Sequence, residues 1–427
     1  MKLSKFNIYV EYKNDLLIYN TLSGGILRLT TPYVQKIQQL RQCPNIIFDN
    51  EDNELFDNLR LGEMIIENDI DELAYLKAHN TLLRFSSSSY GLTIAPTMKC
   101  NFRCPYCYEK GHNLHTMTPE IVEKTKTFIQ NLSQTTKTLS IAWYGGEPLL
   151  ALDIIKEISK TAIDSFGDNY EAYMVTNGYL LTEENIHCLK EICVKDIQIT
   201  IDGPPDIHNK LRKLPNGEDT FFVIIKNIQA AIRIYPELKI TIRVNTDKNN
   251  ISRVDEILDY LQKYNLKDKV HLYLAPVDNI NDTCNSSYCF TNEEFAQEQL
   301  DFIKRNHKEN YHFAHLPKAN PYICGAVSIN SCIIDPLGNI YKCWDDIGRQ
   351  EYIAGNLDDG LSRAENTTKW LNYDFLEANC KECAFLPLCM GGCPNYKIRS
   401  GQNRCMPIKQ NAIELVKLMY DLKIKNR

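Results

Sequence analysis

Short apolar runs alternate with amphipathic stretches from about Tyr90 to Asn306. Six of these runs have the length of buried strands, and helix start signals such as Thr118-Pro119-Glu120 lie between them. The alternation predicts βα units around a parallel sheet, because parallel strands need a crossover between them. The predicted strands are Gly91–Thr97, Leu139–Gly145, Glu171–Gly178, Asp196–Asp202, Lys239–Thr246 and Lys269–Val277.

Six βα units make a sheet curved like part of a TIM barrel. The sequence therefore predicts an α/β fold with a partial (β/α)6 TIM-like barrel over residues 86–310. In such sheets the chemistry collects at the carboxyl ends of the strands, where the loops are free to vary. The polar motifs described below follow the predicted strands directly.

The residues before the barrel predict a small α+β module over residues 1–85. Three short strands are expected at Lys5–Tyr12, Asp15–Asn20 and Gly25–Thr30, followed by helices at Thr31–Leu40 and Glu51–Asn68. Over residues 311–427 the periodicity fades and Cys, Gly and Pro dominate. We expect metal clusters to replace a hydrophobic core in this last segment.

Composition and charge narrow the class of protein. The 427 residues carry a net charge of −6, which gives no basic field of the kind that nucleic-acid binding needs. No apolar run reaches the roughly 18 residues that span a bilayer, and the first residues lack the apolar centre of a signal peptide. We therefore expect a cytoplasmic protein with neither nucleic-acid nor membrane partners.

Sixteen cysteines in such a chain favour thiolates for metal over disulfides. The first group, Cys100, Cys104 and Cys107, has the spacing C-x3-C-x2-C directly after the first predicted barrel strand. Three thiolates in one tight loop can hold three irons of a [4Fe–4S] cube and leave the fourth iron open. A zinc site is the alternative, with His112 or His115 as the fourth ligand that a closed zinc site needs.

This loop resembles that of the radical SAM superfamily in its cysteine spacing, its aromatic Tyr106 and its place after the first strand. The resemblance implies that S-adenosylmethionine (SAM) binds the open iron and is cleaved reductively to a 5′-deoxyadenosyl radical. Gly145-Gly146-Glu147 resembles the family's GGE turn, in which the backbone and the glutamate receive the methionine ammonium.

Four further residues match the family in chain order. Asn177 follows the third strand at the place of the family's ribose contacts. Thr200, Asp202 and Arg212 follow the fourth strand, where the resemblance implies contacts to the SAM ribose and carboxylate. A surface salt bridge is the alternative for Arg212, and an ordinary tight turn is the alternative for the glycine and asparagine motifs.

The second cysteine group has eight members, which match two four-ligand clusters better than one zinc ion. Their order resembles the SPASM extension of radical SAM enzymes. By that resemblance a nearer auxiliary [4Fe–4S] cluster is held by Cys324, Cys332, Cys343 and Cys393, of which Cys332 is the least secure ligand. A farther cluster is held by Cys380, Cys383, Cys389 and Cys405. Two zinc ribbons are the structural alternative.

Five cysteines fit neither group: Cys43, Cys188, Cys193, Cys284 and Cys289. Such residues are more often small buried hydrophobes than ligands. Cys284 and Cys289 lie in a polar loop, where a thiol can react.

SPASM enzymes mostly modify ribosomally made peptides or protein side chains. The residue 1–85 module resembles the winged-helix-like module that recognises leader peptides, which would add a strand to its sheet edge. These resemblances imply a peptide maturase that closes an intramolecular crosslink, with a thioether as the first expectation. They also imply an external one-electron donor such as flavodoxin or ferredoxin.

Two other functions stay open. The chain also resembles anaerobic sulfatase-maturating enzymes, which oxidise Cys or Ser to formylglycine. That family places an Asp base directly after the cysteine at which Trp344 stands here, so Asp345 and Asp346 are out of register as candidate bases. A non-catalytic iron–sulfur electron carrier is the third possibility, and it would not cleave SAM.

Overall fold

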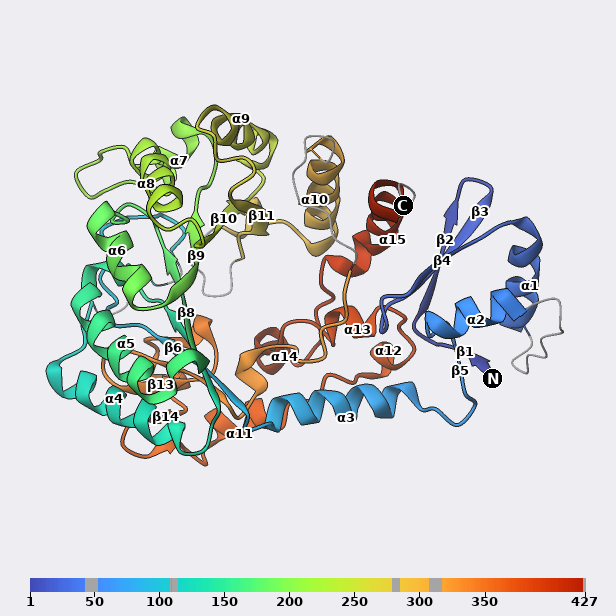
Figure 1. Ribbon diagram of the computed structural model, residues 1–427, viewed down its shortest axis with the longest axis horizontal. Helices are drawn as coiled ribbons and strands as arrows, with labels where there is room; N and C mark the ends of the chain where they lie inside the picture. The colour runs from blue at the N-terminus through green and yellow to red at the C-terminus, as the bar shows by residue number, and fades with distance from the viewer. Residues whose placement is uncertain (43–52, 108, 110–113, 279–284, 307–316, 425–427) are drawn as a thin grey trace.

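The computed structural model describes residues 1–42, 53–107, 109, 114–278, 285–306 and 317–424. The molecule is elongated. The barrel lies at one end, the N-terminal module at the other, and helix α3 runs between them beneath the C-terminal segment (Figure 1).

The six predicted barrel strands are confirmed, each within a few residues of its expected bounds. They pair in parallel in the order β11-β10-β9-β8-β7-β6. Their bounds are β6 Ser89–Ile94, β7 Thr138–Trp143, β8 Tyr170–Thr176, β9 Val194–Thr200, β10 Lys239–Thr246 and β11 His271–Pro276.

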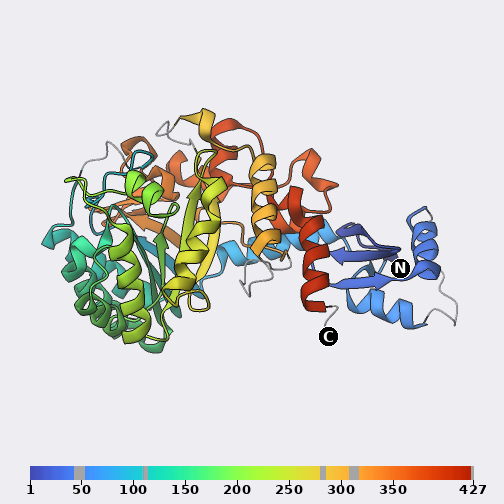
Figure 2. The same cartoon turned by 90° about the horizontal axis from the view of Figure 1, so that it is seen from above.

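Helices cover the outer face of this sheet (Figures 1 and 2). They are α4 Pro119–Ser133, α5 Leu152–Phe166, α6 Glu183–Glu191, α7 Pro205–Leu211, α8 Phe221–Ile234 and α9 Asp255–Lys263. Helix α10 (Asn292–Asn306) instead lies beside the helix at Ile408–Met419 (Figure 1). Strand β10 shows why the layers form. Ile240, Ile242 and Val244 are buried in the main core, while Arg243 and Asn245 line a cavity on the other face.

The sheet continues beyond the barrel. Strand β12 (Ser331–Ile334) pairs in parallel with β6, and β13 (Asn339–Tyr341), β14 (Gly355–Asn356) and β15 (Gly360–Leu361) follow in antiparallel order. The C-terminal segment therefore starts as an extension of the barrel sheet. Its helices are α11 Glu365–Leu371, α12 Ala378–Lys381, α13 Leu386–Cys389, α14 Pro394–Ser400 and α15 Ile408–Met419.

The N-terminal module contains the three predicted strands as an antiparallel sheet of order β2-β3-β4. Their bounds are β2 Asn7–Tyr12, β3 Asp15–Asn20 and β4 Ile26–Leu29, followed by helix α1 at Thr31–Gln42.

The predicted helix Glu51–Asn68 is wrong in its second half. Helix α2 spans Asn53–Leu61, and Ile65–Ile66 form strand β5, which pairs with β1 (Lys2–Leu3). Gly62 follows the helix, and Glu63 has a φ of 54°. This left-handed conformation ends a helix.

Helix α3 (Glu72–Phe85) joins the module to the C-terminal segment, and Asp71 caps its N-terminus. At its other end the buried Arg84 guanidinium donates hydrogen bonds to the carbonyls of Val327, Leu371 and Tyr373, each at 2.9 Å. The side chains of Phe6 and Leu76 are buried in the same apolar cluster as Trp370. The N-terminal module thus packs against the cysteine-rich segment.

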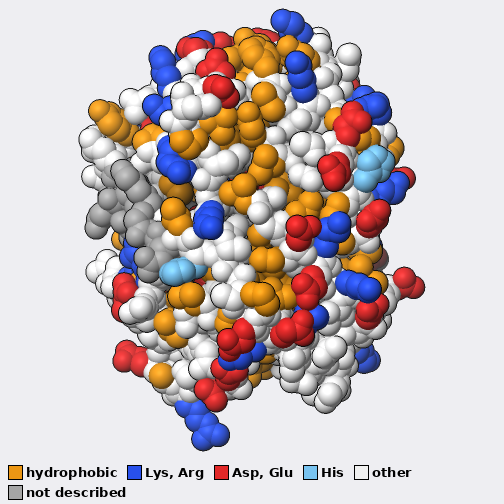
Figure 3. All heavy atoms as spheres, turned by 90° about the vertical axis from the view of Figure 1, so that its left-hand side faces the viewer, with side chains coloured by type: hydrophobic (Ala, Val, Ile, Leu, Met, Phe, Trp, Pro, Cys, Tyr) orange, Lys and Arg blue, Asp and Glu red, His pale blue; other side chains and the backbone are white. Residues whose placement is uncertain are grey.

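The outer face of the barrel carries basic and acidic side chains side by side, without a single-sign field (Figure 3). Within the described residues, no helix combines the length and the apolar character that crossing a membrane requires.

Candidate functional site

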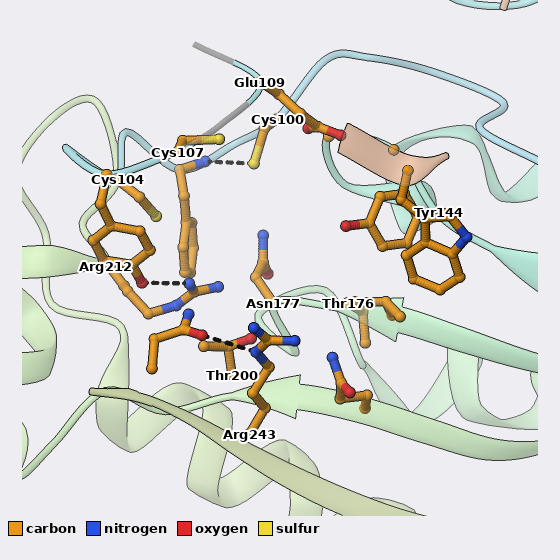
Figure 4. A pocket seen from close by; sticks show the side chains of 18 of the residues that line it. Cys100, Cys104, Cys107, Glu109, Tyr144, Thr176, Asn177, Thr200, Arg212 and Arg243 are labelled. Carbon is orange, nitrogen blue, oxygen red and sulfur yellow. Dashed lines mark hydrogen bonds between the residues drawn. The ribbon is translucent and has the colours of Figure 1, made fainter. Parts of the chain in front are cut away.

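A cavity of about 380 Å³ opens at the carboxyl ends of the barrel strands (Figure 4). Nine of the eleven residues predicted to hold the first cluster and SAM converge on it from separate loops, together with one of the two candidate bases. Those that line it are Cys100, Cys104, Tyr106, Cys107, Gly145, Gly146, Asn177, Thr200, Arg212 and Asp345. The expectation that the polar motifs collect at this edge of the sheet is confirmed.

The three cysteines of the first group lie together on the loop after β6, at one side of the cavity (Figure 4). Burial raises the pKa of the Cys100 thiol to about 12 and that of Cys107 to about 11. These thiols therefore need a metal to hold them as thiolates near neutral pH. Such a donor set fits an iron–sulfur cluster.

The turn at Gly145-Gly146 fixes the position of this loop. The Gly146 N–H donates to the Thr97 carbonyl at 3.1 Å, and the Glu147 N–H donates to the Lys99 carbonyl at 2.9 Å. A Cβ atom on Gly145 would lie 2.3 Å from the Thr97 oxygen, and one on Gly146 would lie 2.3 Å from the Lys99 oxygen. Only glycine allows the two backbones to approach this closely.

Glu147 lies behind the cavity wall and is fully buried. Its carboxylate accepts hydrogen bonds from the Thr176 hydroxyl at 2.7 Å, the Asn177 N–H at 2.8 Å and the Leu149 N–H at 3.1 Å. The side chain thereby ties the end of β8 to the turn after β7. Its expected contact with the methionine ammonium remains a prediction.

Asp202, Tyr106 and Arg212 form a buried network beside the cysteine loop. The Tyr106 hydroxyl donates to Asp202 Oδ2, and Arg212 Nη1 donates to the Tyr106 oxygen at 2.9 Å. Burial raises the pKa of the Asp202 carboxyl, while the charge of Arg212 opposes that rise. Since Arg212 is only 8% exposed, a surface salt bridge is excluded.

Several polar atoms around the cavity have no hydrogen-bond partner in the described structure. They include Asp202 Oδ1, Arg212 Nε and Asn101 Nδ2, all of them buried. An unsatisfied buried polar atom costs about 1–3 kcal/mol. A bound molecule with polar groups, such as SAM, would satisfy atoms of this kind.

Some lining residues had not been predicted from the sequence: Tyr144, Arg243, Asn245, Asp278 and Trp344. The rings of Tyr144 and Trp344 lie 4.5 Å apart and form one wall. The alternation along β10 could have revealed Arg243 and Asn245, since polar residues there occupy the positions opposite Ile and Val.

The two candidate bases differ in position. Asp345 lines the cavity, whereas Asp346 is 2% exposed and pairs with Arg399 at 2.5 Å. Of the two, only Asp345 is placed to meet a substrate.

The cysteines assigned to the farther cluster lie near one another. Burial raises the pKa of the Cys389 thiol to about 11, and Cys383, Cys380 and Cys405 raise it further. Three cysteines of the nearer set also lie close enough to affect one another. Burial raises the pKa of the Cys324 thiol, and Cys393 raises it further. Burial likewise raises the pKa of the Cys343 thiol, and Cys324 adds to that rise. Cys332 is buried in the barrel core.

Among the residues with described coordinates, no three His, Cys, Asp or Glu side chains converge as a single metal ion requires. A [4Fe–4S] cube spreads its ligands over the corners of a larger body. The suggested zinc ligand His112, together with Cys43 and Cys284, lies outside the described residues.

Residues 94–261 match the sequence model of the Radical SAM superfamily. This chain is a radical SAM enzyme. Membership of the family implies a [4Fe–4S] cluster and SAM as cofactors.

Two curated relatives of this radical SAM enzyme differ in how much of it they cover. The cysteine-type anaerobic sulfatase-maturating enzyme of Clostridium novyi is 26% identical over 72% of this chain and 89% of its own length. The radical SAM cyclopropyl synthase TigE of Paramaledivibacter caminithermalis is 24% identical over 98% of this chain and 94% of its own length.

Two solved structures also differ in how much of this chain they cover. Because their sequence identities to it are low, they establish the fold alone. Native anSMEcpe with bound AdoMet and the Kp18Cys peptide has a TM-score of 0.61 and 19% identity, and covers 78% of this chain and 100% of its own. SuiB of Streptococcus suis bound to the precursor peptide SuiA has a TM-score of 0.55 and 15% identity. It covers 95% of this chain and 98% of its own.

We predict that Gly146→Ala disrupts the first cluster site of this radical SAM enzyme. The new Cβ would displace the Lys99 carbonyl and with it the loop that carries Cys100. Iron bound per chain after anaerobic reconstitution should fall by about four atoms, one cube. Gly91→Ala on β6 is the matched control, since its Cβ would lie at an ordinary 3.7 Å from Ser331. Equal iron content in the two variants would contradict the prediction.

Proposed function

We propose that this radical SAM enzyme modifies a ribosomally made precursor peptide and closes an intramolecular crosslink within it. The observation that carries the proposal is the share of this chain over which each relative is similar to it. TigE and SuiB are similar to the chain over 98% and 95% of its length, whereas the sulfatase-maturase relative covers 72%. By name, the two proteins that extend over nearly the whole chain are a cyclopropyl synthase and an enzyme bound to a precursor peptide.

The bond formed is proposed as a thioether. The name of TigE adds a carbon–carbon ring closure as the second bond to test. Both reactions remove hydrogen from the peptide, and the overall change is therefore oxidative. Both also retain the sulfur of the peptide.

The residues around the cavity supply binding and position. A donor such as flavodoxin or ferredoxin would reduce the first cluster. SAM bound to the reduced cluster would then supply the radical that removes an unactivated hydrogen atom from the peptide. Cys100, Cys104 and Cys107 would hold that cluster. Asn177, Thr200 and the network of Asp202 and Arg212 would orient SAM beside it.

Tyr144 lies on the side of the cavity opposite Cys104 (Figure 4), and its ring contacts that of Trp344. These two rings are proposed to limit the access of water to the cavity. Asp345, next to Trp344, is the proposed acceptor of the proton that the peptide loses as the crosslink forms. The electron left on the peptide is proposed to pass to the auxiliary clusters.

Sulfatase maturation is the second candidate, favoured by the Clostridium novyi relative. The position directly after Cys343 opposes it, because Trp344 stands there and the neighbouring Asp346 pairs with Arg399. Mass spectrometry separates the two reactions, since formylglycine made from cysteine loses the sulfur atom that a crosslinked peptide keeps.

We predict that Cys383→Ala separates SAM cleavage from product formation. The first cluster does not depend on Cys383, so 5′-deoxyadenosine should still form, while crosslinked peptide falls at least about tenfold when its electron acceptor is lost. The assay uses short synthetic Cys-containing peptides as substrates. Cys289→Ala, outside both cysteine groups, is the control and should keep the product. Unchanged product with Cys383→Ala would overturn the electron-acceptor role, and loss of sulfur in the parent product would favour sulfatase maturation.

The N-terminal module is proposed to bind the leader of the peptide as an added strand on β4. In the antiparallel pair β3–β4, Asn20 donates a backbone hydrogen bond to Gly25 at 2.9 Å. Hydrogen-bonded pairs alternate along such a ladder, so the N–H groups of Ile26 and Arg28 point to the edge of β4 that pairs with no described strand. An extended peptide can pair with them there.

Arg28→Pro should weaken binding of the leader by about tenfold, because proline removes one edge N–H without removing a hydrogen bond between β3 and β4. Arg28→Thr is the control: it removes the same side chain, including its 2.5 Å ion pair with Asp15, but keeps the N–H. Fluorescence anisotropy of a labelled leader peptide measures both variants. The strand-addition hypothesis fails if the two variants bind the leader equally well.

A further inference from the structure

His208 is a fully buried histidine beside the network of Asp202 and Arg212. It lies in helix α7 and is not among the residues that line the cavity. The backbone N–H of Asp202, just beyond β9, donates to His208 Nδ1 at 3.4 Å. On the other side of the ring, Nε2 lies 3.2 Å from the hydroxyl oxygen of Thr220, directly before α8. One side chain therefore connects the end of a barrel strand to the start of the next long helix.

The hydrogen bonds around the His208 ring fix its protonation state. The Thr220 hydroxyl donates its only hydrogen to the Arg212 carbonyl at 2.6 Å, so its oxygen has to accept from His208 Nε2–H. Nδ1 accepts from Asp202 and therefore carries no proton. Burial lowers the pKa of His208 well below its usual value, and the charge of Arg212 lowers it further. The ring is thus neutral, with its proton on Nε2.

His208 and Thr220 also hold both backbone groups of Arg212. The Arg212 N–H donates to the His208 carbonyl at 2.7 Å, and the Arg212 carbonyl accepts from Thr220. Arg212 follows α7 directly and leaves the helical conformation, with a φ of −126° and a ψ of 63°. The direction in which its side chain departs therefore depends on these two hydrogen bonds.

The Arg212 side chain is the part of this network that a bound molecule can reach. It lines the cavity (Figure 4), and its Nη1 donates to the Tyr106 oxygen at 2.9 Å, while Nε has no partner among the described residues. Tyr106 donates in turn to Asp202. A guanidinium binds a carboxylate best when two of its donors are aligned with the two oxygens. Small shifts of the Arg212 backbone or of Asp202 would therefore weaken binding of the SAM carboxylate.

Two other roles for His208 have to be weighed. It does not act as an acid or base toward the peptide, because both ring nitrogens are bound to protein groups and the ring does not line the cavity. Packing is the second role, since the ring meets that of Phe221 edge-on with 5.6 Å between the centroids. Packing alone does not require a directed hydrogen bond from each ring nitrogen.

We propose that His208 is a positioning residue for SAM: its neutral ring joins Asp202 to Thr220 and so fixes the direction of the Arg212 side chain. The inference rests on the contact between Arg212 and SAM in the proposed function. It adds His208 and Thr220 to the residues on which SAM binding depends, although neither of them lines the cavity.

Thr220 gives the sharpest test, because valine has nearly the same shape but neither donates nor accepts a hydrogen bond. The full chain is reconstituted anaerobically, with sodium dithionite as the reductant. Thr220→Val should raise the KM for SAM about tenfold, with kcat for 5′-deoxyadenosine changed by less than about twofold. Iron per chain should stay that of the parent enzyme. Thr220→Ser keeps the hydroxyl and should keep the parent KM.

Thr125→Val is the matched control. Thr125 is as deeply buried as Thr220, and its hydroxyl donates to the Ile121 carbonyl within α4 at 2.8 Å. The KM of this variant should equal that of the parent enzyme. A purely structural role for Thr220 would instead lower kcat per chain or the iron content at an unchanged KM, because a fraction of the molecules would be inactive. That result would overturn the proposal.

Variants of His208 test the ring itself. His208→Leu removes both hydrogen bonds and keeps an apolar contact with Phe221, so the KM for SAM should rise at least as much as with Thr220→Val. His208→Gln restores a side-chain N–H that can reach Thr220 and should recover part of the affinity. Equal losses in the two variants would assign the effect to the shape of the imidazole and would contradict the role of its hydrogen bonds.

Arg212→Lys separates this inference from the contact on which it rests. Lysine keeps the charge but lacks the planar pair of donors, so the KM for SAM should rise here too. An unchanged KM would refute the contact between Arg212 and SAM, and the inference with it. A raised KM in this variant, with the parent KM in Thr220→Val, would overturn the role of His208 alone. Crosslinked peptide is measured separately, and its absence would refute the proposed peptide reaction without changing these KM values.

Discussion

The close contact between the turn after β7 and the loop before Cys100 determines the rest of the site. Gly145 and Gly146 meet the carbonyls of Thr97 and Lys99 at distances that exclude any side chain. Glu147 extends the connection to the end of β8 through Thr176 and Asn177. Three consecutive strand ends are thereby held together, and the cysteine loop is presented to the cavity in one position.

Buried charge is the second organising feature. Asp202 and Arg212 are held beside the first cysteine group, and Arg84, at the end of α3, is buried against the C-terminal segment that contains Lys342. Burying such groups destabilises a fold unless partners compensate for the lost hydration. Beside the first cysteine group, Asp202 Oδ1 and Arg212 Nε have no hydrogen-bond partner among the described residues.

The barrel could be predicted from the sequence because its signals are local. Apolar runs such as Lys239–Thr246 gave the strands, and parallel pairing brought Asn177, Thr200 and the first cysteines to one edge. Strand β12 could not be predicted, because its pairing with β6 joins residues about 240 positions apart in the chain. The burial of Cys332 in the barrel core depends on that pairing. The end of α2 depends on the conformation at Glu63, which has no strong sequence signal.

The proposed function requires one iron beside the Cys100 loop that lacks a protein ligand and binds SAM. Mössbauer spectroscopy of the anaerobic protein, recorded before and after addition of SAM, tests this most directly. We expect one iron of that cluster to change its spectrum when SAM occupies the free position. A spectrum that SAM leaves unchanged, or a site filled by zinc, would contradict the account.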